Sequence, residues 1–235
     1  MSATERPRLK KFIPIPIQDV DENKGIITGL FAHFDSLDKH GDIIQKGAFK
    51  KTILENGPNG TNEIAHLLDH KSDKAVAVIN VLEESKEHKG LRYESSIGTH
   101  ALGRDFAEMV KSGIIKFHSI GYTVINEVYD PSQKANILRE IKLYEGSSLQ
   151  FIAANHNTPV LGLKSDQDIL EYFDIVQRFI RTSTATDETL KSLEEKLKSL
   201  SDYIAGMTTI ENKKADDNQI NIELLKFNFE KWKIS

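Results

Sequence analysis

The feature that most restricts what this chain can fold into is a series of short apolar runs, rich in β-branched residues, between residues 26 and 153. Gly, Pro, Asn and Asp separate the runs, which is typical of strands joined by turns. We expect strands at 26–34, 63–68, 74–82, 91–97, 116–124, 137–144 and 148–153, with a polar loop at 126–136. The runs at 74–82 and 91–97 should pair as a hairpin. The alternating prolines of 12–17 predict an edge strand or an extended arm.

Helical periodicity interrupts this series twice and dominates the chain after about residue 165. Residues 47–57 and 99–112 read as helices that end at Gly57 and Gly113. The composition therefore divides the chain into a domain at 1–165 and a helical, coiled-coil-like segment at 166–235. Apolar residues recur there at helical spacing: Ile169, Phe173, Val176 and Ile180; Leu190, Leu193, Leu197, Leu200 and Ile204; Ile222, Leu225, Phe229 and Trp232. These helices either pack on their own domain or form an assembly or scaffold-binding tail.

Composition limits the classes of function that remain open. The chain has 235 residues, a formal net charge of −4 and no cysteine. The absence of cysteine excludes disulfides, thiolate catalysis and cysteine metal sites. The negative charge argues against a dedicated nucleic-acid binder. No apolar run is long enough to span a membrane, and no signal-peptide core stands at the N-terminus, so we expect an intracellular protein without a membrane partner.

One serine lies in a setting that suits catalysis. Ser119 stands in an apolar run at 116–124 that predicts a buried strand, and Gly121 allows a close approach by another group. A strand serine is often only structural, but His70 lies upstream and Glu145 downstream, each next to an apolar run. A serine, a histidine and an acid from separate strands can perform acyl transfer. The chain lacks a Gly-x-Ser-x-Gly elbow, which argues against an α/β-hydrolase.

Two patterns suggest metal binding instead. His66-Leu67-Leu68-Asp69-His70 is similar to the His-x-x-Glu-His zinc motif, with aspartate in place of glutamate. On a helix the two histidines would share a face and could bind zinc, whereas on a strand they would be roughly 13 Å apart. The acidic loop at 35–42 does not match the spacing of an EF-hand.

Four blocks of the sequence together resemble a known family. They are Gly29-x5-Asp35-x2-Asp38-x2-Gly41-Asp42-Ile43-Ile44-x2-Gly47-Ala48-Phe49, Leu67-Leu68-Asp69-His70, His118-Ser119-Ile120-Gly121-Tyr122, and Ile141-Lys142-Leu143-Tyr144-Glu145-Gly146-Ser147 with Ala153-Ala154-Asn155. Over about residues 25–160 they are similar to the prohead maturation proteases of tailed phages, the HK97-type family related to herpesvirus assemblin. The resemblance implies an α+β fold, with a small, mostly antiparallel assemblin-like β-barrel flanked by helices and followed by the helical C-terminal segment.

The resemblance also assigns roles to residues. His70 matches the family histidine and Ser119 the nucleophile, while Glu145 stands where assemblins place a second histidine. A carboxylate can orient an imidazole, so the exchange is chemically sound. His156 is the alternative third member. His118 should point to the opposite face from Ser119 on a regular strand and is therefore left out of the triad.

The sequence thus predicts a serine endopeptidase without a cofactor or metal. It would cleave scaffold or capsid-protein segments, and itself, during procapsid maturation, inside the phage procapsid in the host cytoplasm. The expected partners are the major capsid protein and scaffold segments as substrates, with a homo-oligomer possible and no nucleic acid or membrane. The alternatives are a non-catalytic capsid assembly or scaffold protein that works through its helical tail, and a zinc metallopeptidase that uses His66 and His70.

Overall fold

The computed structural model describes residues 9–13, 19–21, 25–38, 41–150 and 166–210. The chain forms two compact units, which are described separately below. Unit 1 comprises residues 1–107 and 115–150, and unit 2 comprises residues 108–114 and 151–235. The predicted boundary at residue 165 lies outside the described residues and stays a prediction.

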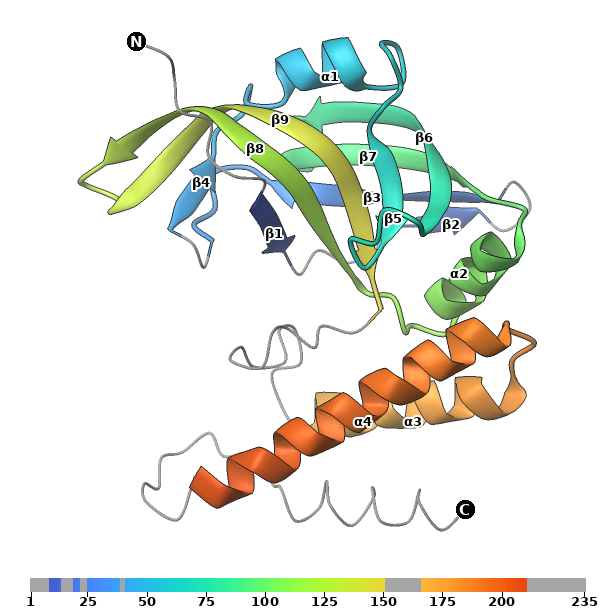
Figure 1. The fold of residues 1–235 in the computed structure, drawn as a ribbon. Coiled ribbons are helices and arrows are strands. Elements are labelled where there is room, and N and C mark those ends of the chain that lie inside the picture. Colours follow the sequence, from blue (N-terminus) through green and yellow to red (C-terminus); the bar gives the residue numbers. More distant parts are fainter. Residues whose placement is uncertain (1–8, 14–18, 22–24, 39–40, 151–165, 211–235) are drawn as a thin grey trace. The chain divides into compact units, whose positions relative to one another are not determined.

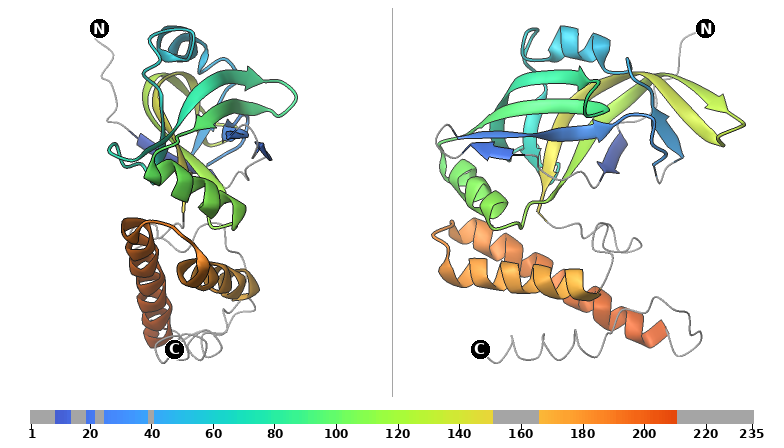
Figure 2. Two further views of the ribbon diagram at one scale, coloured as in Figure 1. Left: turned by 90° about the vertical axis from the view of Figure 1, so that its right-hand side faces the viewer. Right: turned by 180° about the vertical axis from the view of Figure 1, so that it is seen from behind.

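Unit 1 is built on one strongly curved sheet that wraps into a nearly closed barrel (Figures 1 and 2). The order of the strands is β1-β8-β9-β5-β6-β7-β3-β2, and β4 pairs with β9 beside this path. All pairs are antiparallel except those of β9 with β4 and β5. The strands are β1 Leu9–Ile13, β2 Asp19–Asp21, β3 Ile26–His33, β4 Asp42–Ile44, β5 Ala65–Leu68, β6 Ala75–Ser85, β7 Gly90–Ile97, β8 Phe117–Asp130 and β9 Ala135–Leu149. The predicted mixed fold with a mostly antiparallel barrel is confirmed.

The β8–β9 hairpin is longer than the sequence predicts. Its pairing runs from Phe117 opposite Leu149 to Asp130 opposite Ala135, so the predicted polar loop at 126–136 and the predicted break near Gly146 are both wrong. Polar residues continue the strands because the hairpin projects past the barrel, where side chains meet water (Figure 1). Gly146 does not turn the chain. It leaves room for the ring of Phe31, which lies where a β-carbon would stand.

The turn at the end of this hairpin is organised by one carboxylate. Asp130 accepts hydrogen bonds from the backbone N–H and hydroxyl of Ser132 and from Gln133. These bonds stabilise the charged form and lower the pKa of Asp130 to about 2. At the turn, where strand pairing ends, hydrogen bonds to the Asp130 carboxylate therefore hold the backbone.

The two helices predicted within the strand series are both present. α1 spans Lys50–Asn56 and lies across one end of the barrel (Figure 1). The residues just before α1 are held by the Glu84 carboxylate of β6, which accepts hydrogen bonds from the N–H groups of Gly47 and Phe49 at 2.9–3.0 Å. α2 spans Ala101–Lys111, buries Phe106 and Met109 as predicted, and is followed by Gly113 in the left-handed region at φ 74°.

The barrel interior contains a hydrogen-bonded group of aromatic and polar side chains. Phe31 and Tyr93 stack with ring centroids 4.0 Å apart, and the Tyr93 hydroxyl lies 2.6 Å from His118 Nε2. His66 places Nδ1 3.0 Å from the Ser95 hydroxyl and Nε2 2.9 Å from the Ser148 hydroxyl. All of these side chains are buried. Burial, and then the nearby His118, lower the pKa of His66 to about 3, so the barrel holds this imidazole in its neutral form.

Unit 2 contains a pair of contacting helices, α3 Asp166–Thr182 and α4 Asp187–Ile210. The predicted start of the second helix is confirmed, because Thr186 Oγ1 accepts the Thr189 N–H at 3.4 Å and caps α4. Apolar side chains at the predicted spacing are buried: Phe173 and Val176 of α3, and Leu193 and Leu197 of α4. The side chains of Leu200 and Ile204 and the helix predicted around 222–232 lie outside the described residues.

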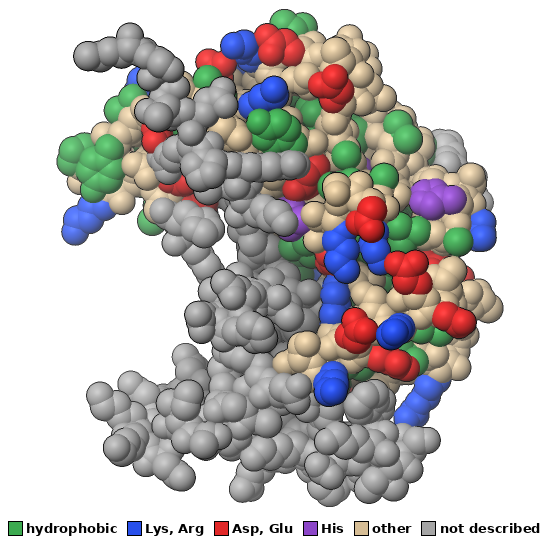
Figure 3. All heavy atoms as spheres, in the orientation of Figure 1, with side chains coloured by type: hydrophobic (Ala, Val, Ile, Leu, Met, Phe, Trp, Pro, Cys, Tyr) green, Lys and Arg blue, Asp and Glu red, His purple; other side chains and the backbone are tan. Residues whose placement is uncertain are grey.

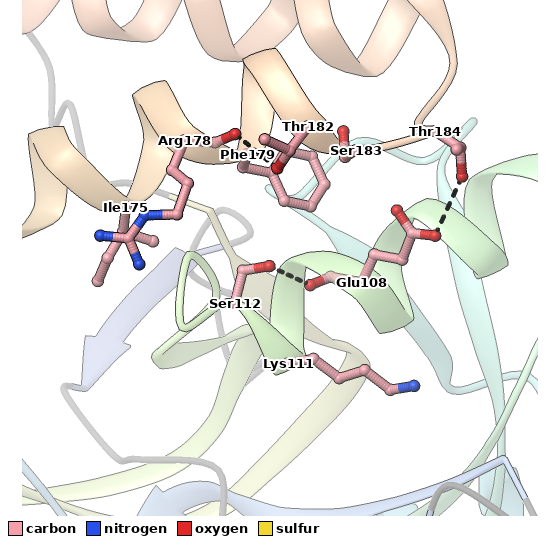
Figure 4. A pocket seen from close by; sticks show the side chains of 9 residues that line it. All are labelled: Glu108, Lys111, Ser112, Ile175, Arg178, Phe179, Thr182, Ser183 and Thr184. Carbon is pink, nitrogen blue, oxygen red and sulfur yellow. Dashed lines mark hydrogen bonds between the residues drawn. The ribbon is translucent and has the colours of Figure 1, made fainter.

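A pocket of about 420 Å³ lies within unit 2 (Figure 4). Its lining consists of Glu108, Lys111, Ser112, Ile175, Arg178, Phe179, Thr182, Ser183 and Thr184. The Glu108 carboxylate accepts a hydrogen bond from the Thr184 hydroxyl at 3.4 Å. None of the predicted catalytic residues lines this pocket, so the candidate site must be sought in the barrel.

Acidic and basic side chains are interspersed over the described part of the face in Figure 3, so neither sign dominates that face. Within the part of the chain that the structure describes, no helix is long and apolar enough to cross a membrane.

The buried neutral His66 predicts that stability falls in acid. Unfolding releases an imidazole of ordinary pKa 6.5, which binds a proton that the folded chain does not bind until about pH 3. The free energy of unfolding should therefore decrease as the pH falls below about 6.5. Between pH 7 and about pH 5.5 the wild type should lose about 1 kcal/mol more than His66→Gln, as measured by urea unfolding followed by circular dichroism. His100→Gln, which changes an exposed histidine, should retain the wild-type slope.

Candidate active site

The register of β8 against β9 sorts the predicted site residues onto two faces. Ser119 pairs with Ser147, and Gly121 pairs with Glu145. Paired residues and alternate residues of a strand share a face, so these four lie on one side of the two strands. His118 pairs with Ser148, and its side chain bonds Tyr93 in the barrel interior. The prediction that His118 points away from Ser119 is confirmed.

His70 reaches the face of Ser119 from a turn. β5 ends at Leu68 and pairs in parallel with β9, with Leu67 opposite Ser147 and Leu68 opposite Ser148. The chain then turns through Asp69 and His70 before β6 begins. This pairing brings the turn to the end of β9, beside the residues that follow Glu145.

Two of the three predicted residues meet in one short contact, and the third lies across the strand pair from a serine that bonds both of them. His70 Nδ1 lies 2.6 Å from Glu145 Oε1, and their side chains are 12% and 3% exposed. Ser119, which is buried, stands directly across the strand pair from Ser147. The Ser147 hydroxyl donates to Glu145 Oε2 at 2.6 Å and accepts the backbone N–H of His70 at 3.1 Å. Ser119 thus lies next to a connected group of base and acid.

The contact between Glu145 and His70 fixes the chemistry that the imidazole can perform. A carboxylate in its ionised form accepts hydrogen bonds and cannot donate them, so it pairs with the tautomer of His70 that carries a proton on Nδ1. Nε2 is then the basic nitrogen of the neutral ring and is available to take a proton from a hydroxyl. Such an arrangement can hold an imidazole in the tautomer that a general base needs.

The sequence predicts that Gly121 allows a close approach by another group, but it gives the side chain of Ser147 no role. Gly121 is needed because a β-carbon there would overlap Glu145 Oε1, so the carboxylate lies directly over the glycine backbone. Ser147 belongs to the block that carries the resemblance, and its spacing of two residues from Glu145 would have placed both on one face of a continuous strand. Because the sequence predicts a break at Gly146, it does not place Ser147 on the same face as Glu145. His156, the alternative third member, lies outside the described residues.

The structure does not form the helix that the zinc alternative requires. Residues 65–68 are a strand, and His66 and His70 contact opposite faces of β9: His66 bonds Ser148, whereas His70 bonds Glu145. The two histidines do not lie on one continuous strand either, because the chain leaves the strand at Asp69. Among the described residues, no group of three or more His, Cys, Asp or Glu side chains is placed to hold a metal ion.

The sequence is similar to those of known proteins. The sequence profile of the caudovirus prohead serine proteases matches residues 13–169. The chain belongs to this family. It is 26% identical over 164 residues to the prohead protease of Enterobacteria phage HK97, covering 69% of this chain and 70% of that protein. A solved structure, the capsid assembly protease of bacteriophage T4, matches with a TM-score of 0.47 and 13% identity over 60% of this chain and 96% of that chain.

The place of Gly121 under the Glu145 carboxylate predicts an effect of Gly121→Ala. The added methyl should displace the carboxylate from His70 and lower peptidase activity at least tenfold, because an oriented charged hydrogen bond contributes about 1.5–3 kcal/mol. Activity on a processed peptide would be measured in a double-mutant cycle with Glu145→Ala. In the Glu145→Ala background, Gly121→Ala should cause little further loss. Equal losses in both backgrounds would show that Gly121 acts independently of Glu145.

Proposed function

We propose that the chain is a serine endopeptidase in which Ser119 is the nucleophile, His70 the general base and Glu145 the acid that orients His70. The observation that carries this proposal is the 2.6 Å contact of His70 Nδ1 with Glu145 Oε1 on the face that holds Ser119. Membership of the prohead serine protease family supports the same assignment.

The proposed reaction follows from the position of each group. His70 Nε2 takes the proton of the Ser119 hydroxyl as its oxygen attacks the carbonyl carbon of the scissile peptide. The tetrahedral intermediate collapses when His70 gives that proton to the leaving amine, and an acyl-enzyme remains. Water, deprotonated by the same nitrogen, attacks the acyl carbon. The ester bond to Ser119 then breaks, His70 returns the proton to the Ser119 oxygen, and the acid product leaves. Glu145 stays ionised throughout and stabilises the positive charge that forms on His70.

We assign scaffold or capsid-protein segments as substrates, and the chain itself as a further one. The chain would act inside the procapsid in the host cytoplasm, with the major capsid protein as its main partner. The support is the family relationship, including the relative that is named a prohead protease. Burying a carboxylate against an imidazole costs desolvation energy that an assembly protein has no need to spend, so the pair favours an enzyme over a non-catalytic scaffold protein.

Substitution of the three residues tests the assignment. Ser119→Ala and His70→Ala should each lower kcat/KM by about a thousandfold or more, because the chemical step needs both groups. Glu145→Gln should fall between these variants and the wild type, with the loss mainly in kcat. The assay is co-expression with the capsid protein, followed by mass spectrometry of the products. Processing by Ser119→Ala at near wild-type rates would remove Ser119 as the nucleophile.

Two controls separate this chemistry from the alternatives. A serine-directed phosphonate should label Ser119 and no other serine. A chelator should leave activity unchanged, whereas loss of activity in EDTA and its recovery with zinc would favour the metallopeptidase. His66→Gln should fold less stably but keep most of its activity, because the His66 ring lies on the interior face of β9.

We further propose that the C-terminal helical segment serves assembly or scaffold binding. In support, α3 and α4 belong to unit 2, whereas Ser119, His70 and Glu145 all belong to unit 1. A chain that ends before Asp166 should therefore still cleave a short peptide but enter procapsids poorly, as measured by peptide hydrolysis and by co-sedimentation with procapsids. Loss of peptide cleavage by a soluble truncated chain would assign these helices to the catalytic unit.

A further inference from the structure

We infer that Ser147 is a positioning residue that holds the base and the acid of the catalytic group in place together. This inference rests on the proposed function, since it concerns the same site. Ser147 is a fully buried serine of β9. Its hydroxyl contacts Glu145 and the backbone of His70, and its backbone pairs with Ser119. Ser147 is thus connected to all three proposed catalytic residues, to Glu145 and His70 through its hydroxyl and to Ser119 through strand pairing.

The first task of Ser147 is to orient the Glu145 carboxylate. Its hydroxyl donates to Oε2, which leaves Oε1 to accept the proton of His70 Nδ1. Glu145 is 2% exposed, so water cannot easily replace a missing donor. Gly121, over which the carboxylate lies, has no side chain that could restrain it. Without the hydroxyl of Ser147, the carboxylate would be free to rotate away from His70.

The second task is to hold a strained turn. Asp69 and His70 adopt left-handed backbone conformations at φ 54° and 59°, which are unfavourable for residues with a β-carbon. Bonds to β9 and its end offset this cost: the Asp69 N–H to the Ser148 carbonyl at 3.0 Å, the Gln150 N–H to Asp69 Oδ1 at 3.0 Å, and the His70 N–H to the Ser147 hydroxyl at 3.1 Å. The last of these bonds holds the base itself.

Both tasks are linked through one hydroxyl group. The Ser147 hydroxyl accepts a hydrogen bond from the His70 N–H and donates one to the Glu145 carboxylate, so each bond polarises the other. The backbone and the ring of His70 are then connected to the same carboxylate, one through Ser147 and one directly. The structure therefore assigns Ser147 an effect on kcat rather than on substrate binding, since its hydroxyl already serves the base and the acid.

The neighbouring serine provides a matched control. Ser148 is also fully buried in β9, and its hydroxyl also bonds a histidine, but that histidine is His66 on the interior face. Ser147→Ala and Ser148→Ala therefore remove the same atom from adjacent positions. A loss caused merely by a weakened barrel should appear in both variants, whereas a loss caused by misplacement of His70 should appear only in Ser147→Ala.

The experiment measures kcat and KM on a processed peptide, together with the downfield proton NMR signal of the hydrogen-bonded His70 Nδ1–H. Ser147→Ala should lower kcat about ten- to a hundredfold, with KM changed less than about threefold, and should weaken or remove the signal. Ser148→Ala should keep the signal and most of kcat. Ser147→Thr, which retains the hydroxyl, should recover both. If Ser147→Ala is insoluble, Ser147→Cys carries the same expectation, because a thiol is a weak donor.

Wild-type kcat and an intact signal in soluble Ser147→Ala or Ser147→Cys would overturn the inference, as would equal losses in the Ser147 and Ser148 variants. The outcome is separable from that of the proposed function. If Ser119→Ala is inactive but the Ser147 variants behave like wild type, only the positioning role fails. If Ser119→Ala stays active, the proposed function fails, and the NMR signal still shows whether Ser147 holds the pair of Glu145 and His70.

Discussion

The site depends on the register between β8 and β9. This pairing places Ser119 opposite Ser147 and Gly121 opposite Glu145 on one face, and His118 opposite Ser148 on the other. Because side chains alternate along a strand, a slip of one residue would exchange the two sets. It would turn Ser119 into the barrel and bring the buried His118 to the face of Glu145. One geometric constraint therefore keeps both the core and the candidate site in place.

The two faces of the β8–β9 strand pair stabilise their buried polar groups in different ways. Inside the barrel, His66 is neutral and each of its ring nitrogens meets a serine hydroxyl, so no charge needs to be stabilised there. On the face of Ser119, Glu145 is nearly as deeply buried but has His70 and Ser147 as partners. Buried carboxylates persist where donors of this kind surround them. The same strands thus contain a neutral, hydrogen-bonded histidine on one face and a carboxylate–imidazole pair on the other.

Much of this organisation could be predicted from the sequence, because it depends on local periodicity. Most of the strands, the two short helices, the start of α4, and the face of His118 follow from alternation and from turn residues, whereas the short strands β2 and β4 were not predicted. The continuity of β9 could not be predicted, because a glycine at position 146 indicates a break in the strand. The glycine is instead needed to make room for the ring of Phe31, which belongs to β3, far away in the sequence. The left-handed turn at Asp69 and His70 could not be predicted either, because bonds to Ser147 and Ser148 stabilise it.

The same long-range contacts explain why the third residue fits as a carboxylate. Glu145 accepts one hydrogen bond on each oxygen, from His70 Nδ1 and from the Ser147 hydroxyl. A neutral imidazole has a single acceptor nitrogen and could not accept both bonds. A histidine in this position would have to leave Ser147 without its acceptor or reverse the direction of that bond. The arrangement of Ser147 therefore favours glutamate as the partner of His70 and makes the hydroxyl and the carboxylate depend on each other.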